Sequence, residues 1–122
     1  NQMGGKSSRT KGQVGELEVC KILSTELGIS LDRNLEQTRD GGADIIVNNV
    51  WFIEVKRQEK YNVDAWWLQA CSQAQGKGKY PVLFFRKSRE SWRVIMPYSL
   101  THDPLTHYVH CDLALFIERI KE

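Results

Sequence analysis

The chain has 122 residues, of which 41% are hydrophobic and 26% charged, and its 17 Lys and Arg outnumber its 15 Asp and Glu by two. This size and composition predict one globular domain with its own core, and they exclude a disordered chain, a collagen-like repeat and a disulfide scaffold. The longest uncharged apolar run covers residues 80–85, far short of the roughly 20 residues that span a bilayer.

The first eleven residues are polar and rich in glycine and serine. We expect residues 1–11 to form a flexible basic arm, carrying Arg9 and Lys11, and residues 12–122 to form the folded domain. A second basic window lies between Lys77 and Arg93, where six basic residues against one acidic residue give a local charge of +5. Two such segments suggest an anionic partner, although composition alone favours plain solvated surface charge by roughly two to one.

An amphipathic helix is predicted from about Gly12 to Leu27. Its apolar face is expected to include Leu17, Cys20, Leu23 and Leu27. At 100° per residue, Glu16 falls in the middle of this face and Glu18 points away from it. A carboxylate in an apolar face needs a partner, and Gly12 and Gly15 would let another backbone approach closely.

A β-hairpin is predicted next. Residues 30–38 read as a weakly patterned extended segment, and residues 40–42 as a turn. Residues 43–47 and 50–57 read as two strands joined at Asn48-Asn49, because β-branched and aromatic residues flank a turn dipeptide.

A second helix is predicted to begin at Val63, with Asn62 as its N-cap. Apolar residues recur there with helical spacing, at Val63, Trp66, Trp67, Ala70, Cys71 and Ala74. Trp66 and Trp67 diverge by 100°, so we do not expect both to be buried in one monomer core.

The C-terminal third is expected to hold strands at residues 81–86 and 92–96, an irregular stretch over 97–111, and a short helix from Leu113 to Ile120. The resulting order is one helix, three strands, a helix, two strands and a helix, which is a mixed α/β sandwich. The irregular stretch carries His102, His107, His110 and Cys111, whose spacing is not that of a structural zinc site.

Charge inside a hydrophobic strand is costly, yet Glu54 and Lys56 share one face of the second strand. A simple ion pair would explain them both. Asp44, in the neighbouring strand, weakens that explanation. A two-residue turn would place Asp44 opposite Ile53 and away from Glu54, so a shared site requires a three-residue loop or a bulge, which we predict. Asp44, Glu54 and Glu16 would then form a metal site for Mg²⁺, with Lys56 stabilising charge on a phosphate.

These residues carry a resemblance. Gly42-Ala43-Asp44, followed after a gap by Ile53-Glu54-Val55-Lys56, resembles the PD-(D/E)XK nuclease signature, with Ala43 at the proline position. The inward Glu16 is also a feature of that superfamily. Within it, the small size and the segments RTKG…GELEV and GGADI…IEVK most resemble archaeal-type Holliday junction resolvases and related phage enzymes.

The resemblance implies a restriction-endonuclease-like fold with an α-β-β-β-α-β core and Mg²⁺-dependent cleavage of four-way DNA junctions by a homodimer, with Mn²⁺ able to substitute. It also implies a polar residue of the second helix at the site, for which Gln73 is the candidate. The basic residues expected to contact DNA are Arg9, Lys11, Arg57, Lys77 and Lys79. Another restriction-like or repair endonuclease, and a catalytically silent DNA-binding module, are the alternatives.

An intracellular location is expected: cytoplasm or nucleoid, or the host cytoplasm if the protein is viral. No N-terminal stretch has the pattern of a signal peptide, and three widely spaced cysteines favour a reducing compartment.

Overall fold

The computed structural model describes residues 2–34 and 43–122, with side chains from residue 11 onward. Its elements are, in chain order, α1 (Gln2–Leu27), β1 (Ile45–Val47), β2 (Trp51–Arg57), α2 (Val63–Gln75), β3 (Tyr80–Arg86), β4 (Arg93–Pro97), β5 (Tyr108–Asp112) and α3 (Leu113–Lys121). The strands form one mixed sheet in the order β1-β2-β3-β4-β5. The pair β2–β3 is parallel and the other pairs are antiparallel.

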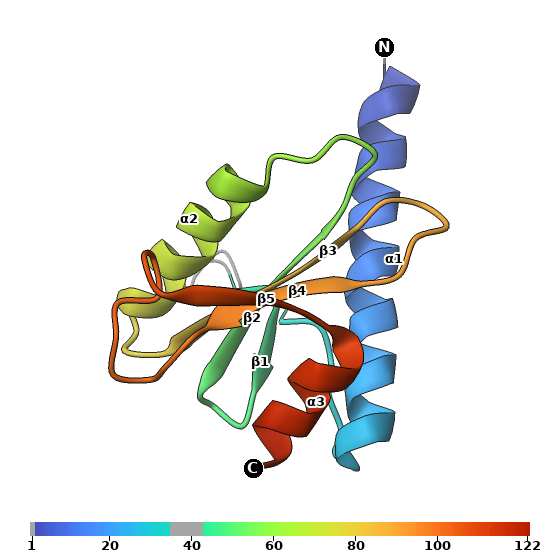
Figure 1. Ribbon diagram of the computed structural model, residues 1–122. Coiled ribbons are helices and arrows are strands. Elements are labelled where there is room, and N and C mark those ends of the chain that lie inside the picture. Colours follow the sequence, from blue (N-terminus) through green and yellow to red (C-terminus); the bar gives the residue numbers. More distant parts are fainter. Residues whose placement is uncertain (1, 35–42) are drawn as a thin grey trace.

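Helices cover both faces of the sheet, as Figure 1 shows, with α2 on one side and α1 and α3 on the other. One core cluster joins α1 and α3 to the sheet, and in it Phe84 meets Phe116 edge to face at 5.2 Å. A second cluster packs α2 on Leu83, Phe85 and Ile95. Because both faces are covered, the central strand β3 can be a nearly continuous apolar run. The single-domain α/β fold with a restriction-endonuclease-like sheet is therefore confirmed.

The β1–β2 hairpin has the predicted irregular turn. Val47 pairs with Trp51, so three residues, 48–50, form the loop. Asn48 and Asn49 both have positive φ, at 54° and 56°, which asparagine tolerates better than most residues. Ile45 pairs with Ile53, and the alternation of the strands then places Asp44 on the same face as Glu54.

Three predictions of secondary structure are corrected. Helix α1 begins at Gln2 and not near Gly12, so the expected boundary between residues 11 and 12 is not a break in the helix. Residues 30–34 form no strand, and the rest of the expected first strand, together with the turn at 40–42, lies outside the described residues. The stretch 97–111 is not wholly irregular, because its last four residues belong to β5. In the described chain, two strands precede α2 and three follow it.

The apolar faces of the helices also differ in part from expectation. Leu17 is 56% exposed, and the buried face of α1 is centred on Glu16, Val19, Cys20 and Leu23. Trp66 and Trp67 are both buried, at 6% and 4% exposure, contrary to prediction. Each finds its own partners because α2 lies across the width of several strands: Trp66 packs on Phe85, and Trp67 packs on Tyr108 of β5. No helix in residues 2–34 or 43–122 is long and apolar enough to cross a membrane.

Candidate active site

A cleft of about 470 Å³ opens where β2 continues beyond the end of the short strand β1. The first side of this cleft is α1, which contributes Lys11 and Glu16. Its other side is formed by Asp44, just before β1, and by β2 with the loop that follows it. The lining residues from β2 and this loop are Val55, Lys56, Arg57, Gln58, Glu59 and Lys60. The cleft thus gathers five of the predicted site residues: Lys11, Glu16, Asp44, Lys56 and Arg57.

Asp44 is held in place by backbone contacts. Its Oδ2 accepts a hydrogen bond of 2.8 Å from the amide of Val55. Its own amide donates to the carbonyl of Ile53 at 3.0 Å. Asn34 also holds the backbone at Asp44. Its amide donates a hydrogen bond to the carbonyl of Asp44, and its side chain donates one to the carbonyl of Ala43. Sequence reasoning missed Asn34, which lies in a stretch with no periodic pattern.

Glu54 lies beneath the cleft and is only 2% exposed. Its buried Oε2 has no hydrogen-bond partner among the described residues. Burial, then the hydrogen bond and negative charge of Asp44, raise the pKa of Glu54 to about 9, and Lys56 only partly opposes this. Without a further cation, the Glu54 carboxyl is therefore protonated near neutral pH.

Glu16 reaches the cleft from α1 and is 8% exposed, which confirms the predicted inward direction. Its Oε1 accepts a hydrogen bond of 3.0 Å from Nε of Arg33. Burial and the charge of Asp44 raise the pKa of Glu16, while Arg33 and Lys56 lower it. Arg33 is a second residue that sequence reasoning missed, since nothing local marks a partner 17 residues away.

The expected group of three carboxylates is not assembled. No three His, Cys, Asp or Glu side chains in the described part of the chain are grouped closely enough to hold a metal ion. This covers the histidines of residues 102–110 as well. Asp44 and Glu54 instead form a pair, and Glu16 is engaged by Arg33.

A divalent cation nevertheless fits the pair. Oε2 of Glu54 lacks a partner among the described residues, and the pKa of Glu54 is raised; a bound cation would supply that partner and favour the ionised carboxylate. Mg²⁺ in particular is bound in many proteins by one or two carboxylates and keeps several of its waters. Asp44 and Glu54 are thus the residues suited to hold such an ion.

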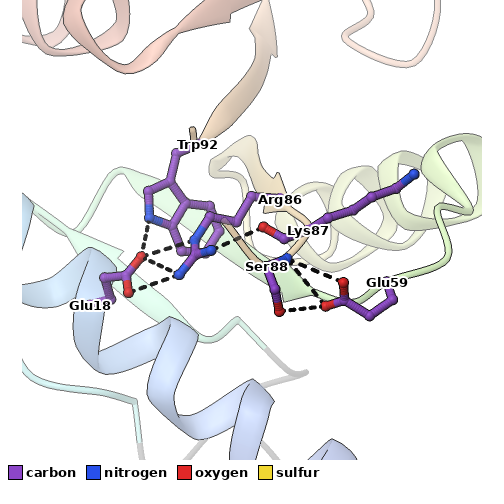
Figure 2. Close-up of polar contacts among 6 residues, drawn as sticks. All are labelled: Glu18, Glu59, Arg86, Lys87, Ser88 and Trp92. Atoms are coloured by element: carbon purple, nitrogen blue, oxygen red, sulfur yellow. Dashed lines mark hydrogen bonds and ion pairs between the residues drawn. The ribbon is translucent and has the colours of Figure 1, made fainter. Parts of the chain in front are cut away.

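Glu18, predicted to point away from the apolar face that holds Glu16, contacts Arg86 and Trp92. Figure 2 shows its carboxylate between Arg86 and Trp92, on the side of α1 next to β3 and β4. Arg86 donates through Nε and Nη2, each at 3.0 Å, and Trp92 through Nε1 at 2.6 Å. Arg86 is 8% exposed, so this basic residue of the window at 77–93 belongs to the interior and not to a surface for an anionic partner. The bridge fixes α1, and therefore Glu16, against the sheet.

The two helix glycines have different surroundings. A Cβ on Gly15 would lie 3.1 Å from Cβ of Arg57 and 3.6 Å from Val55, so glycine allows α1 to approach β2 as predicted. A Cβ on Gly12 would meet nothing within 4 Å, so the prediction of close packing there is wrong. The close approach of α1 to β2 at Gly15 therefore determines how near the neighbouring Glu16 lies to β2.

The lining of the cleft does not include the other predicted residues whose side chains are described. Lys77 and Lys79 precede β3, at the end of the sheet where Tyr80 pairs with Trp51. That is roughly 17 Å along β2 from Lys56. Gln73 is half-buried on α2 beside Ala74, which packs on Ala43 and Phe52. Arg9 lies in α1, outside the part of the chain whose side chains are described.

A second polar contact closes one side of the cleft. Glu59 accepts hydrogen bonds from the amide and hydroxyl of Ser88, joining the loop after β2 to the loop after β3 (Figure 2). Nζ of Lys11 lies 3.6 Å from the same carboxylate. These contacts link α1 to both loops.

Comparison with known families gives a match for residues 7–112, to the family described as "Phage putative PDDEXK endonuclease". No curated protein and no solved structure matches the chain. The matched residues contain α1 from Ser7, the hairpin with Asp44, Glu54 and Lys56, α2 and the rest of the sheet. Match and geometry agree, and the chain belongs to this phage family of PD-(D/E)XK endonucleases.

Proposed function

We propose that the protein is a Mg²⁺-dependent DNA endonuclease that prefers four-way junctions and acts as a homodimer. The observation that carries the catalytic part is the buried pair of Asp44 and Glu54, with Lys56 two residues further on the same face. This combination is costly to fold without a cation, and structural roles do not require it.

Each residue has a role that follows from its position. Asp44, fixed by the amide of Val55, and Glu54 would hold the divalent ion. When bound, that ion would polarise a phosphate and lower the pKa of a bound water. Lys56 would hold the attacking water and stabilise negative charge on the phosphate. Glu16, kept at the edge of the cleft by Arg33, would orient water or further cation ligands.

DNA binding is proposed to use residues around and beyond the cleft. Lys11 and Arg57 line the cleft and would hold the phosphates next to the one that is cut. Arg9 lies earlier in the same helix and would extend this contact. Lys77 and Lys79 would contact the backbone at the far end of the sheet. Gln73 remains a candidate polar contact from α2.

A homodimer would supply one cleft for each of the two strands cut in a junction. The two tryptophans of α2 no longer support it, because both are buried. The region of α3 still does: Tyr98 and Leu100, 62% and 54% exposed, border a hollow beside Ile120. An apolar surface of this kind suits a contact between subunits.

The test is cleavage of a matched set of labelled substrates, namely a four-way junction, a flap and a linear duplex, with Mg²⁺, Mn²⁺ or EDTA. We expect paired, symmetric nicks in the junction with either metal and none with EDTA. Equal cutting of all three substrates would favour the restriction-like or repair endonuclease instead.

The matched variants are Glu54→Gln and Glu118→Gln, which make the same change in the buried site and on the exposed face of α3. We expect Glu54→Gln to bind the junction without cutting it, and Glu118→Gln to cut normally. Junction binding by the wild type without cleavage under any metal condition would identify the silent DNA-binding module.

A further inference from the structure

A second cavity, of about 450 Å³, lies on the α2 face of the sheet, and half of its lining residues carry rings. Five of the ten lining residues are Tyr61, Trp67, Phe85, Tyr108 and His110. Phe, Trp and Tyr supply four of the ten but make up only 10% of the chain, so aromatic side chains are concentrated here. The volume lies within the range of about 300–1,000 Å³ that is usual for small-ligand pockets.

The rings are held in fixed positions. Nε1 of Trp67 donates to the carbonyl of Pro104 at 3.1 Å. Tyr61 meets Phe85 edge to face at 5.2 Å, and Tyr108 lies 5.7 Å from Trp67. Phe85 and Trp67 are buried, whereas Tyr108 is 40% exposed at the mouth. The cavity therefore has an apolar floor and one accessible aromatic wall before any ligand arrives.

Polar groups are present at defined places. The buried hydroxyl of Tyr61 has no hydrogen-bond partner among the described residues. The guanidinium of Arg93 and Nζ of Lys87 lie 5.7 Å and 4.8 Å from the centre of the Tyr61 ring. Asp64, in the first turn of α2, adds a hydrogen-bond acceptor at the rim. Cations beside aromatic faces favour an anionic ligand that carries a planar ring.

The cavity is next to the candidate active site. Lys56 is the register partner of Phe85, and Phe85 is the partner of Arg93, so the three form one row across the sheet. Neighbouring strands lie about 4.8 Å apart, which puts Arg93 about 10 Å from the strand of Lys56. Lys60 lines the cleft and Tyr61, the next residue, lines the cavity.

We propose that this cavity holds an unstacked nucleobase of the DNA strand whose phosphate lies in the cleft. The aromatic wall would stack the base, the Tyr61 hydroxyl and Asp64 would bond its edge, and Arg93 and Lys87 would contact the flanking phosphates. The proposal rests on the proposed function. Such a site would favour DNA with an unstacked base, as at a branch point or in a single strand, because a base inside a regular duplex cannot enter the cavity.

The test uses binding without cleavage. A single-stranded oligonucleotide that contains 2-aminopurine is titrated with the full-length protein in EDTA, and both anisotropy and 2-aminopurine fluorescence are recorded. Stacking in the cavity should quench the fluorescence. The matching duplex should bind without that quenching.

Tyr108→Leu removes the accessible ring and keeps apolar contact, and Leu68→Ala is its control. Leu68 is an apolar residue of α2 that is 52% exposed and is not among the lining residues of this cavity or of the cleft. We expect Tyr108→Leu to weaken single-strand binding about fivefold or more and to abolish quenching, and Leu68→Ala to leave both unchanged. Tyr61→Phe, which retains the ring, should bind more weakly while the fluorescence is still quenched.

Wild-type quenching that persists in Tyr108→Leu would overturn the proposal, as would equal losses of binding in Tyr108→Leu and Leu68→Ala. If Tyr108→Leu is unfolded by circular dichroism, unchanged binding by Tyr61→Phe and by Arg93→Gln would overturn it. Cleavage by the wild type with Mg²⁺ is measured separately. Cleavage without quenching contradicts only the nucleobase site, and quenching without cleavage contradicts only the nuclease assignment.

Discussion

The amide of Val55 donates a 2.8 Å hydrogen bond to Oδ2 of Asp44, so the strand that carries Glu54 also fixes the carboxylate beside it. An asparagine at position 44 can still accept this bond through its side-chain oxygen but loses the negative charge. We therefore expect Asp44→Asn to keep the fold and to lose cleavage on the order of 100-fold or more. Single-turnover nicking of the junction measures the loss.

The control for this prediction is Asp32→Asn, which makes the same change at an exposed position near Arg33. It should cut at the wild-type rate. Similar rates in the two variants would remove Asp44 from the site.

The stability of the metal-free protein should depend on pH through Glu54. Its pKa is raised from 4.5 to about 9 in the folded chain, so between these values the folded state holds a proton that the unfolded state has lost. Stability is then greatest at low pH and falls as pH rises, by at most about 1.4 kcal/mol per unit for one proton. Glu16, whose pKa is also raised, contributes with the same sign.

Thermal unfolding in EDTA between about pH 5 and about pH 8 checks this slope. Glu54→Gln should flatten it, and added Mg²⁺ should raise the melting temperature of the wild type at the upper end but not that of the variant. A wild-type slope of the opposite sign would contradict the raised pKa of Glu54.

Local pattern predicted much of this structure, and long-range contact explains what it missed. The helices α2 and α3 and the hairpin have clear periodicity, and the three-residue loop followed from requiring Asp44 and Glu54 on one face. Strand β5 was missed because it is a largely exposed edge strand of mostly polar residues, with no clear alternation of apolar and polar side chains in its sequence.

The charged partners were beyond any sequence pattern. Arg33 contacts Glu16 across 17 residues, and Arg86 contacts Glu18 across 68. Only the folded chain shows that Glu16 and Glu18, two positions apart on one helix, bind arginines from different parts of the molecule.

The bridge from Glu18 should matter more for stability than a surface ion pair. Glu18→Ala leaves the 8%-exposed Arg86 and the Nε1 of Trp92 without their acceptor. Because Glu18 itself is partly exposed, we expect a loss of about 1–3 kcal/mol in the free energy of unfolding.

Its control is Glu90→Ala, which breaks the 3.6 Å pair with Arg93 on the surface. That change should cost under about 1 kcal/mol. Urea denaturation of both variants gives the comparison. Equal losses in the free energy of unfolding would show that the Glu18 bridge contributes no more than a surface ion pair.

The close approach of α1 to β2 predicts different outcomes for its two glycines. Gly15→Val would force side-chain atoms against Arg57 and Val55 and should destabilise the fold by about 1–3 kcal/mol. Gly12→Val, with open space at its Cβ, should change stability by under about 0.5 kcal/mol. Denaturation midpoints of the pair measure this, and a larger loss at Gly12 would contradict the packing described.

The arrangement of the proposed site depends on the number of residues in the loop at 48–50, and not only on their identities. Surface loops commonly tolerate insertions and deletions. Here the removal of one residue would turn Asp44 to the α1 side of the sheet while Glu54 and Lys56 stayed in place. Homologues that retain activity should therefore vary the loop's amino acids freely but conserve its residue count, or change it only in steps of two.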